Sequence, residues 1–188
     1  MESQGEILAI KWKITSQEVY ATRRFYQRFI SSFSEGVERV CICSPFFDKL
    51  PTPFDNIIGF CRFLQQREVD KIVIITRPPG SDKQAMTVET ARYLDAQGVE
   101  FAIRAKPYLH AKMYHLEFKR GYFRSFIGSA NFTMGGLERN QEIVAEMEGV
   151  GPASPCEREL ARLLSDNGAM TFPVWVQRHL PAGVEMTI

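Results

Sequence analysis

The stretch KIVIIT, residues 71–76, is followed by one arginine and then by PPG, residues 78–80. Consecutive β-branched apolar residues that end at turn-forming residues are typical of a strand buried on both faces of a sheet. Similar signals extend in both directions along the chain. Helical periodicity covers residues 54–66 and 88–96, and apolar runs typical of strands cover residues 37–44 and 99–104.

This alternation of strands and helices predicts a parallel sheet with helices packed on its faces. From residue 109 the pattern changes to three strands with short connections and then a late helix. We therefore expect an α/β fold in one domain over residues 1–188, with a mixed, largely parallel sheet flanked by helices on both faces. The later elements are expected over residues 109–118, 122–127, 142–147 and 155–164.

The two ends of the chain carry weaker signals. A short strand is expected over residues 7–14, and Ser16 is a candidate N-cap for a helix that runs to Phe33. The tail around Trp175 fits either a final strand or an arm that packs on the core. The arginines expected on a solvated face of the first helix are Arg23, Arg24 and Arg28.

The overall composition is that of an ordinary globular protein, with 188 residues and a formal net charge of +1. This charge argues against a polycation that coats nucleic acid, although a local basic cleft remains compatible with it. No segment reaches the ~18 apolar residues needed to span a bilayer. The acidic first six residues do not resemble a signal peptide. We expect a cytoplasmic protein that does not act at a membrane.

Metal binding is not expected. No two cysteines have the spacing of a zinc knuckle. His110 and His115 would face opposite sides of a strand, so they and Glu117 are not expected to form a zinc cluster. The cysteines are instead expected to be buried free thiols in a reducing compartment. They are Cys41, Cys43, Cys61 and Cys156.

The stretch LHAKM, residues 109–113, carries the most informative side chains. If this segment is extended, His110 and Lys112 share one face of the strand, where a single phosphate could meet both. A neutral imidazole can attack phosphorus, and an ammonium can hold the non-bridging oxygens. His110 taken alone would more often be a hydrogen-bonded structural histidine, and the residues that follow favour the catalytic role.

Those residues are GSANFT, at 128–133, and NQE, at 140–142. Gly128 lets the backbone approach a ligand closely, and Ser129 and Asn131 supply donors just past a predicted strand. A plain turn would use the same residue types. Glu142 begins an otherwise apolar strand, where a carboxylate can hydrogen-bond to the histidine ring and stabilise the imidazolium.

The order and spacing of these residues resemble the His-Lys-Asp motif of the phospholipase D superfamily, in particular its small nuclease branch with one motif. The family pattern has an Asp where this chain has Glu117. Because Glu117 would lie on the strand face opposite His110, we expect it to support structure rather than chemistry. The residues that match the pattern are His110, Lys112, Gly128, Ser129, Asn131 and Glu142.

The resemblance also implies a homodimer. Large members of the family build one site from two motifs, and this chain carries only one. The small members pair two copies across a two-fold axis, and symmetric dimers are the commonest oligomers. In such a site, one His110 attacks phosphorus and the partner's His110 protonates the leaving oxygen. Lys112 and Asn131 of both copies would neutralise the phosphoryl oxygens, so no metal or other cofactor is expected.

Other residues are candidates for contact with the substrate. Three basic residues at or beyond predicted strand ends are candidates for a phosphate groove. The aromatic residues Phe46, Phe47 and Tyr108 can stack on bases, but we expect them to pack in the core. The basic residues are Arg77, Arg104 and Lys106.

The resemblance, taken with these features, leaves three functional classes, and it implies the first of them. The first is a metal-independent DNA endonuclease that acts through a phosphohistidine, with DNA favoured over RNA and any sequence specificity supplied by a partner protein. The second is a phospholipase or phosphatidyl transferase, which would need an interfacial surface. The third is a nucleic-acid-binding module without catalysis, against which the intact set of His110, Lys112 and Asn131 argues.

Overall fold

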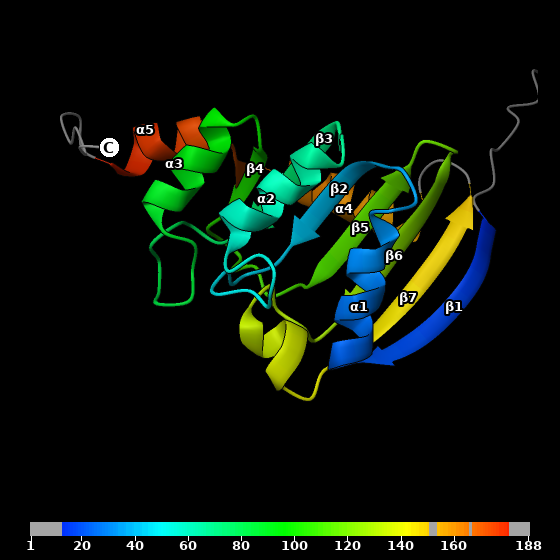
Figure 1. Ribbon diagram of the computed structural model, residues 1–188. Helices are drawn as coiled ribbons and strands as arrows, with labels where there is room; N and C mark the ends of the chain where they lie inside the picture. Colours follow the sequence, from blue (N-terminus) through cyan, green and yellow to red (C-terminus); the bar gives the residue numbers. More distant parts are fainter. Residues whose placement is uncertain (1–12, 151–153, 166, 181–188) are drawn as a thin grey trace, which may run out of the picture.

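The computed structural model describes residues 13–150, 154–165 and 167–180. One eight-stranded sheet forms the centre of this part of the chain, in the order β1-β7-β6-β5-β2-β3-β4-β8 (Figure 1). The strands are β1 (Lys13–Ala21), β2 (Val37–Cys43), β3 (Lys71–Thr76), β4 (Glu100–Arg104), β5 (Met113–Phe118), β6 (Tyr122–Gly128), β7 (Ile143–Val150) and β8 (Ala169–Met170).

The sheet is mixed, as predicted, and its parallel part is smaller than predicted. Strands β2, β3 and β4 pair in parallel, whereas every other pairing is antiparallel. The turn from β5 to β6 is too short for a crossover, which fixes that pair as antiparallel. The buried run of β3 lies between two parallel neighbours, as the continuous apolar stretch indicated.

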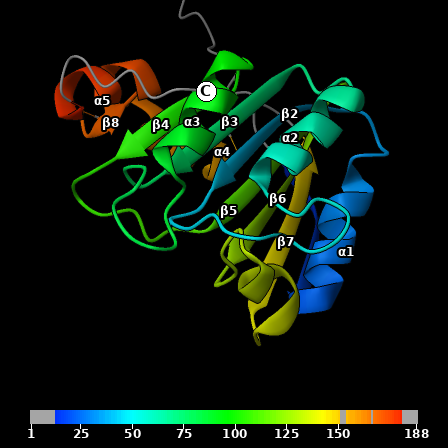
Figure 2. The ribbon, with the colours of Figure 1, turned by 60° about the vertical axis from the view of Figure 1, so that its left-hand side comes forward.

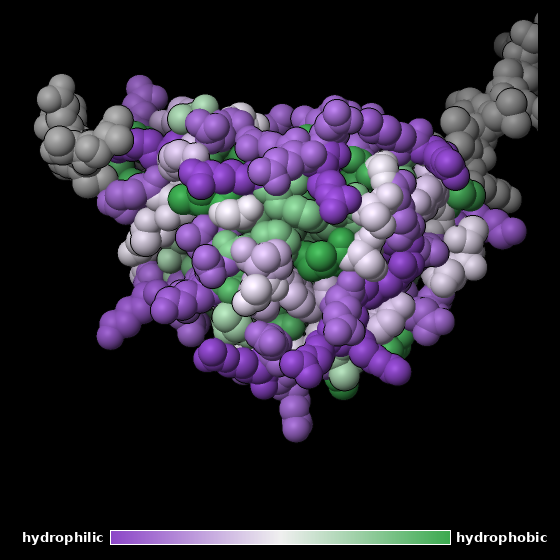
Figure 3. Space-filling model, viewed as in Figure 1, coloured by the Kyte–Doolittle hydropathy of each residue, from purple (hydrophilic) through white to green (hydrophobic). Residues whose placement is uncertain are grey.

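Helices cover both faces of the sheet, unequally (Figure 2). The larger hydrophobic core joins one face to α1, α2, α3 and α5, and a smaller core joins the other face to α4. Hydrophilic residues predominate around the rim of the larger-core side (Figure 3). The helices are α1 (Thr22–Ser32), α2 (Ile57–Gln66), α3 (Val88–Ala96), α4 (Pro155–Ser165) and α5 (Phe172–His179), with a π-helical turn η1 (Gly135–Arg139).

Two predictions at the ends of the chain differ in part from the structure. Ser16 does not cap a helix, because it lies in strand β1, which pairs along its length with β7. Sheet pairing overrides the weak helical signal there, and α1 begins only at Thr22. Trp175 lies in helix α5 rather than in a strand, and it packs in the larger core as the alternative prediction had it. The strand expected over residues 7–14 falls mostly outside the described residues.

The four cysteines are buried and free, as predicted. Burial raises the pKa of the Cys43 and Cys61 thiols to about 12. Buried thiols of this kind remain protonated at neutral pH and are poor nucleophiles.

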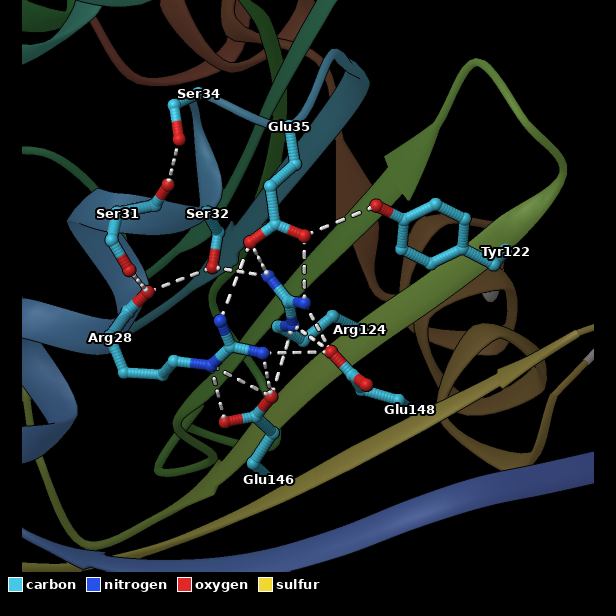
Figure 4. A network of polar contacts seen from close by, with 9 residues as sticks. All are labelled: Arg28, Ser31, Ser32, Ser34, Glu35, Tyr122, Arg124, Glu146 and Glu148. Carbon is cyan, nitrogen blue, oxygen red and sulfur yellow. Dashed lines mark hydrogen bonds and ion pairs between the residues drawn. The ribbon is translucent and has the colours of Figure 1, made fainter.

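A network of charged side chains joins α1 to strands β6 and β7 (Figure 4). Arg28 was expected on a solvated face, but its guanidinium lies 3.0 Å from Glu146. Arg124 also lies 3.0 Å from Glu146 and pairs with Glu35 at 2.9 Å. Glu146 is buried on β7, and the two arginines beside it offset the cost of burying its charge. Glu148 and Tyr122 complete the network.

Candidate active site

The candidate site lies at the edge of the sheet where β2 and β6 end and β5 and β7 begin. Strand β5 starts at Met113, four residues later than predicted, and His110 precedes it in a loop. Arg77 Nε donates to the carbonyl oxygen of Leu109 at 2.8 Å. If β5 began earlier, the Leu109 carbonyl would instead accept a hydrogen bond from a neighbouring strand. The position of His110 is therefore set by the loop and not by the alternation of side chains along a strand.

The structure brings His110 and Lys112 together. Lys112 Nζ lies 3.2 Å from each ring nitrogen of His110 and donates to the His110 carbonyl oxygen at 2.8 Å. The ammonium and the imidazole ring therefore lie close enough to meet the same phosphate group.

Lys112 and His110 differ in exposure. His110 is exposed to solvent, whereas Lys112 is 8% exposed. Burial lowers the pKa of the Lys112 ammonium, the nearby Glu142 carboxylate opposes this shift, and the Arg77 guanidinium adds to it. The site therefore combines an accessible ring with a cation held in a dry position, where its charge acts more strongly than in water.

The turn after β6 supplies the other polar groups. Ser129 Oγ donates to Glu142, and Ser129 is exposed beside it. Asn131 Oδ1 is buried and has no hydrogen-bond partner among the described residues. Gly128 is required here because a Cβ atom would lie 2.1 Å from the carbonyl oxygen of Ile143. The side chain of Tyr114 holds the turn, since its hydroxyl donates to the Ala130 carbonyl at 2.7 Å.

Glu142 lies beside this turn, and its contacts differ from those expected. Its carboxylate accepts hydrogen bonds from Ser129 Oγ and, at 3.2 Å, from Asn140 Nδ2. Among the described residues, it accepts none from the His110 ring. The Glu142 charge nevertheless acts on Lys112. Within one chain, Glu142 therefore orients the Ser129 turn and balances the Lys112 charge.

Thr22 is a positioning residue that the sequence did not indicate. Its hydroxyl donates to the Asn140 carbonyl at 2.5 Å and accepts from the Glu142 amide at 2.9 Å. Ser44 acts similarly, because its hydroxyl accepts from the Phe132 amide at 3.1 Å. Both residues are buried and lie far from the motif in sequence, where spacing gives no signal.

The other predicted site residues lie in three different places. Arg77 adjoins the loop of His110, and Lys106 is exposed in the same loop. Arg104 is not available to a substrate in this structure, because it is 3% exposed and donates to the Leu163 carbonyl of α4 at 2.7 Å. Glu117 pairs with Arg39 and lies 3.4 Å from His115. Its carboxylate is therefore engaged with Arg39 and His115.

Among the described residues, no group of three or more His, Cys, Asp or Glu side chains is arranged to hold a metal ion. No helix in that part of the chain is long and apolar enough to cross a membrane. The candidate site is a set of nitrogen and oxygen groups at one sheet edge, namely an imidazole, an ammonium, a hydroxyl, an amide and a carboxylate. Such a set can attack a phosphodiester and hold its non-bridging oxygens.

Comparison with known proteins identifies the family. The model of a family described as cardiolipin synthase, PLD-like domain, matches residues 29–164, well over half of the chain. The chain therefore belongs to the phospholipase D superfamily, as the motif predicted. Family membership together with the site residues indicates an enzyme that acts on phosphodiester bonds. No curated protein matches the chain.

Solved structures share the fold at low sequence identity. Nuc, a phospholipase D family member from Salmonella typhimurium, is 17% identical with a TM-score of 0.58, over 83% of this chain and 97% of that one. Yeast tyrosyl-DNA phosphodiesterase is 18% identical with a TM-score of 0.50, over 78% and 35%. Phosphatidylserine synthase from Haemophilus influenzae is 10% identical with a TM-score of 0.51, over 88% and 41%. These similarities show the fold alone.

Proposed function

We propose that the protein is a metal-independent DNA endonuclease, a single catalytic domain that works as a homodimer through a phosphohistidine on His110. The observation that carries this proposal is the contact between the Lys112 ammonium and both ring nitrogens of an exposed His110. It supplies a nucleophile and a phosphate-holding cation at the same point. Ser129 and Asn131 add polar groups at the same sheet edge.

The proposed reaction has two displacements at phosphorus. A neutral ring nitrogen of His110 attacks, a P–N bond forms, and the P–O bond to the leaving oxygen breaks. The partner subunit's His110 gives that oxygen its proton and then removes a proton from water. The water oxygen attacks phosphorus and releases His110. Each chain carries one such histidine, so the full cycle needs two copies.

A surface beside the site suits the second copy. Helix α4 covers its face of the sheet only in part, and Val19 and Ile143 on that face are 68% and 69% exposed. Ile143 directly follows Glu142, so an apolar contact there adjoins the half-site. We infer that this surface, defined by Val19 and Ile143, lies in the dimer interface.

The surface has a matched control on the same strand. Val150 is also exposed on β7, and strand alternation places it on the opposite face from Ile143. Light scattering should show a dimer for the wild type and Val150→Glu, and a monomer without activity for Ile143→Glu. A dimer that persists in Ile143→Glu would place the interface elsewhere.

DNA is the proposed substrate, and a lipid phosphodiester is the second candidate. Exposed Lys106 in the loop of His110 supports a polynucleotide, and one protein with this fold is named for tyrosyl-DNA. The family description as cardiolipin synthase, with a phosphatidylserine synthase among the similar structures, supports the lipid candidate. Any sequence specificity would come from a partner protein.

Cleavage assays distinguish these candidates. Labelled single- and double-stranded DNA and phospholipid vesicles are each incubated with the wild type and His110→Ala in excess EDTA. We expect DNA cleavage in the wild type and none in the variant. Lipid turnover without DNA cleavage would establish the second candidate, and tight DNA binding without turnover would indicate a binding module.

A further inference from the structure

Tyr108 is the aromatic residue nearest to His110 in sequence, and it is not in the core. The sequence predicted that Tyr108, Phe46 and Phe47 pack in the core, and Phe47 is indeed buried. Tyr108 is instead 67% exposed. It lies two residues before His110, and two residues span at most about 7 Å of chain. A broad aromatic face is therefore open to solvent within one nucleotide's reach of the candidate nucleophile.

Arg77 links this ring to the site. Its guanidinium carbon lies 5.8 Å from the centroid of the Tyr108 ring and 4.7 Å from that of Phe46. The same side chain donates to the Leu109 carbonyl at 2.8 Å. Arg77 therefore contacts the Tyr108 ring and also hydrogen-bonds the backbone next to His110, which places the ring and the nucleophile on the same loop.

A hollow of about 200 Å³ adjoins the ring and is lined by Arg77, Ser81, Asp82 and Tyr108. Asp82 is held in place, because Oδ1 accepts from the amides of Gln84 at 2.8 Å and Ala85 at 2.9 Å. Its other oxygen lies 3.5 Å from Arg77 Nη1, and the Asp82 side chain is 40% exposed. The hollow therefore offers an aromatic wall, a hydroxyl and a carboxylate acceptor.

We propose that this hollow, the Tyr108 pocket, binds the nucleobase next to the scissile phosphate. The base stacks on the open face of Tyr108, and its N–H groups face Asp82. A phosphate fits this position poorly, because the carboxylate repels it and Arg77 already pairs with that carboxylate. A base inside a duplex cannot stack in this way, so the nucleotide bound here is unpaired. This inference rests on the proposed function and adds the form of the substrate.

Binding measurements test the pocket without chemistry. In a His110→Ala background, fluorescence anisotropy compares a single-stranded decadeoxynucleotide with an abasic deoxyribose-phosphate chain of equal length. Tyr108→Ala should weaken binding of the base-containing chain about tenfold or more, the usual size of a lost base-aromatic stack, and leave the abasic chain unchanged. Tyr108→Phe keeps the ring and should keep the affinity.

Tyr93 provides a matched control, since it is an exposed tyrosine under Arg62, on helix α3 rather than in the loop of His110. Tyr93→Ala should change neither affinity. Equal losses for both chains in Tyr108→Ala, or no loss, would overturn the pocket. Binding that depends on Tyr108, without DNA cleavage by the wild type, would keep the pocket and refute the endonuclease. DNA cleavage by the wild type, together with binding that does not depend on Tyr108, would refute the pocket and keep the endonuclease.

Discussion

The hydroxyl of Tyr114 donates a 2.7 Å hydrogen bond to the carbonyl oxygen of Ala130. Tyr114 is fully buried in the aromatic core on strand β5, one residue after Met113, and Ala130 lies between Ser129 and Asn131. This bond ties the strand that follows His110 and Lys112 to the turn that carries the other polar groups. The spacing between the two halves of the motif is therefore set from within the core.

Tyr114→Phe should keep the packing of the ring and leave the Ala130 carbonyl without its donor. We expect a loss of about 1–3 kcal/mol in the free energy of unfolding, because a buried acceptor loses its partner. Urea unfolding measures this loss. Activity should fall in the folded variant, since the turn is no longer fixed. Unchanged stability and activity would show that the bond does not hold the site.

Thr22→Val tests the residue that holds the other side of the site. The substitution preserves shape but removes the acceptor of the Glu142 amide and the donor to the Asn140 carbonyl. Stability should fall by about 1 kcal/mol, because two part-buried backbone groups lose their hydrogen-bond partner. Because Glu142 would lose its position, the rate constant of cleavage should fall more than substrate affinity does. A thermal melt and steady-state kinetics separate these effects, and wild-type kinetics would contradict the role.

Lys112 predicts a distinctive dependence on pH. Burial lowers the pKa of its ammonium below the ordinary value of 10.5, with Glu142 opposing and Arg77 adding to the shift. Activity should therefore decline at a lower alkaline pH than an ordinary lysine would give. Stability should change in the opposite direction. Between the lowered and the ordinary pKa the unfolded chain binds more protons, so the contribution of Lys112 to stability rises with pH.

The comparison with Lys112→Arg isolates this group. A guanidinium remains charged throughout the alkaline range, so the variant should lose the alkaline decline even if its different shape lowers activity overall. Cleavage rates and unfolding free energies measured over the same pH series provide the readout. An identical alkaline decline in both proteins would assign it to another group.

The network of Arg28, Arg124, Glu35 and Glu146 predicts loss of stability in acid. The hydrogen bond from Arg124 holds the pKa of Glu35 below its ordinary value of 4.5. The resulting stabilisation is present above that ordinary value and is lost as the pH falls through the lowered pKa. Arg124→Met should destabilise the fold by about 3 kcal/mol at neutral pH, because Glu146 keeps only one of two compensating arginines.

Urea unfolding between pH 7 and pH 3 tests this expectation. The difference between Arg124→Met and the wild type should shrink toward acid as Glu35 becomes protonated in both. Arg162→Met removes an exposed arginine from helix α4 and should change stability little, since its ion pair with Glu159 is solvated. A constant difference for Arg124→Met across the pH range would contradict the role of Glu35.

Sequence patterns predicted the centre of the fold better than its ends. Strand β3 and helix α3 have the predicted bounds, because burial and turn residues mark both ends of each. The predicted helix start at Ser16 was wrong because this segment pairs with β7, which lies far along the chain. Local periodicity carries no information about that pairing. Trp175 was similarly ambiguous, since a short apolar segment suits either a helix or a strand.

The candidate site was predictable as a set of residue types but not as a set of contacts. The motif spacing named His110, Lys112 and Asn131, and the structure adds the positions of their side chains. The structure excludes Arg104 from the candidate site, because its side chain turns toward α4. Its position at the end of a strand did not predict this direction. The structure also shows that Glu142 contacts Ser129. The pairing of β6 with β7 brings these two residues together, and the sequence does not reveal that pairing.

Capture of the covalent intermediate tests the phosphohistidine at His110 most directly. Internally ³²P-labelled single-stranded DNA is mixed with the protein in EDTA, quenched in alkaline denaturant, and resolved by denaturing protein electrophoresis. We predict label that migrates with the wild-type chain and is absent in His110→Ala. DNA cleavage in EDTA without labelled protein, or equal labelling of His110→Ala, would contradict a phosphohistidine at His110.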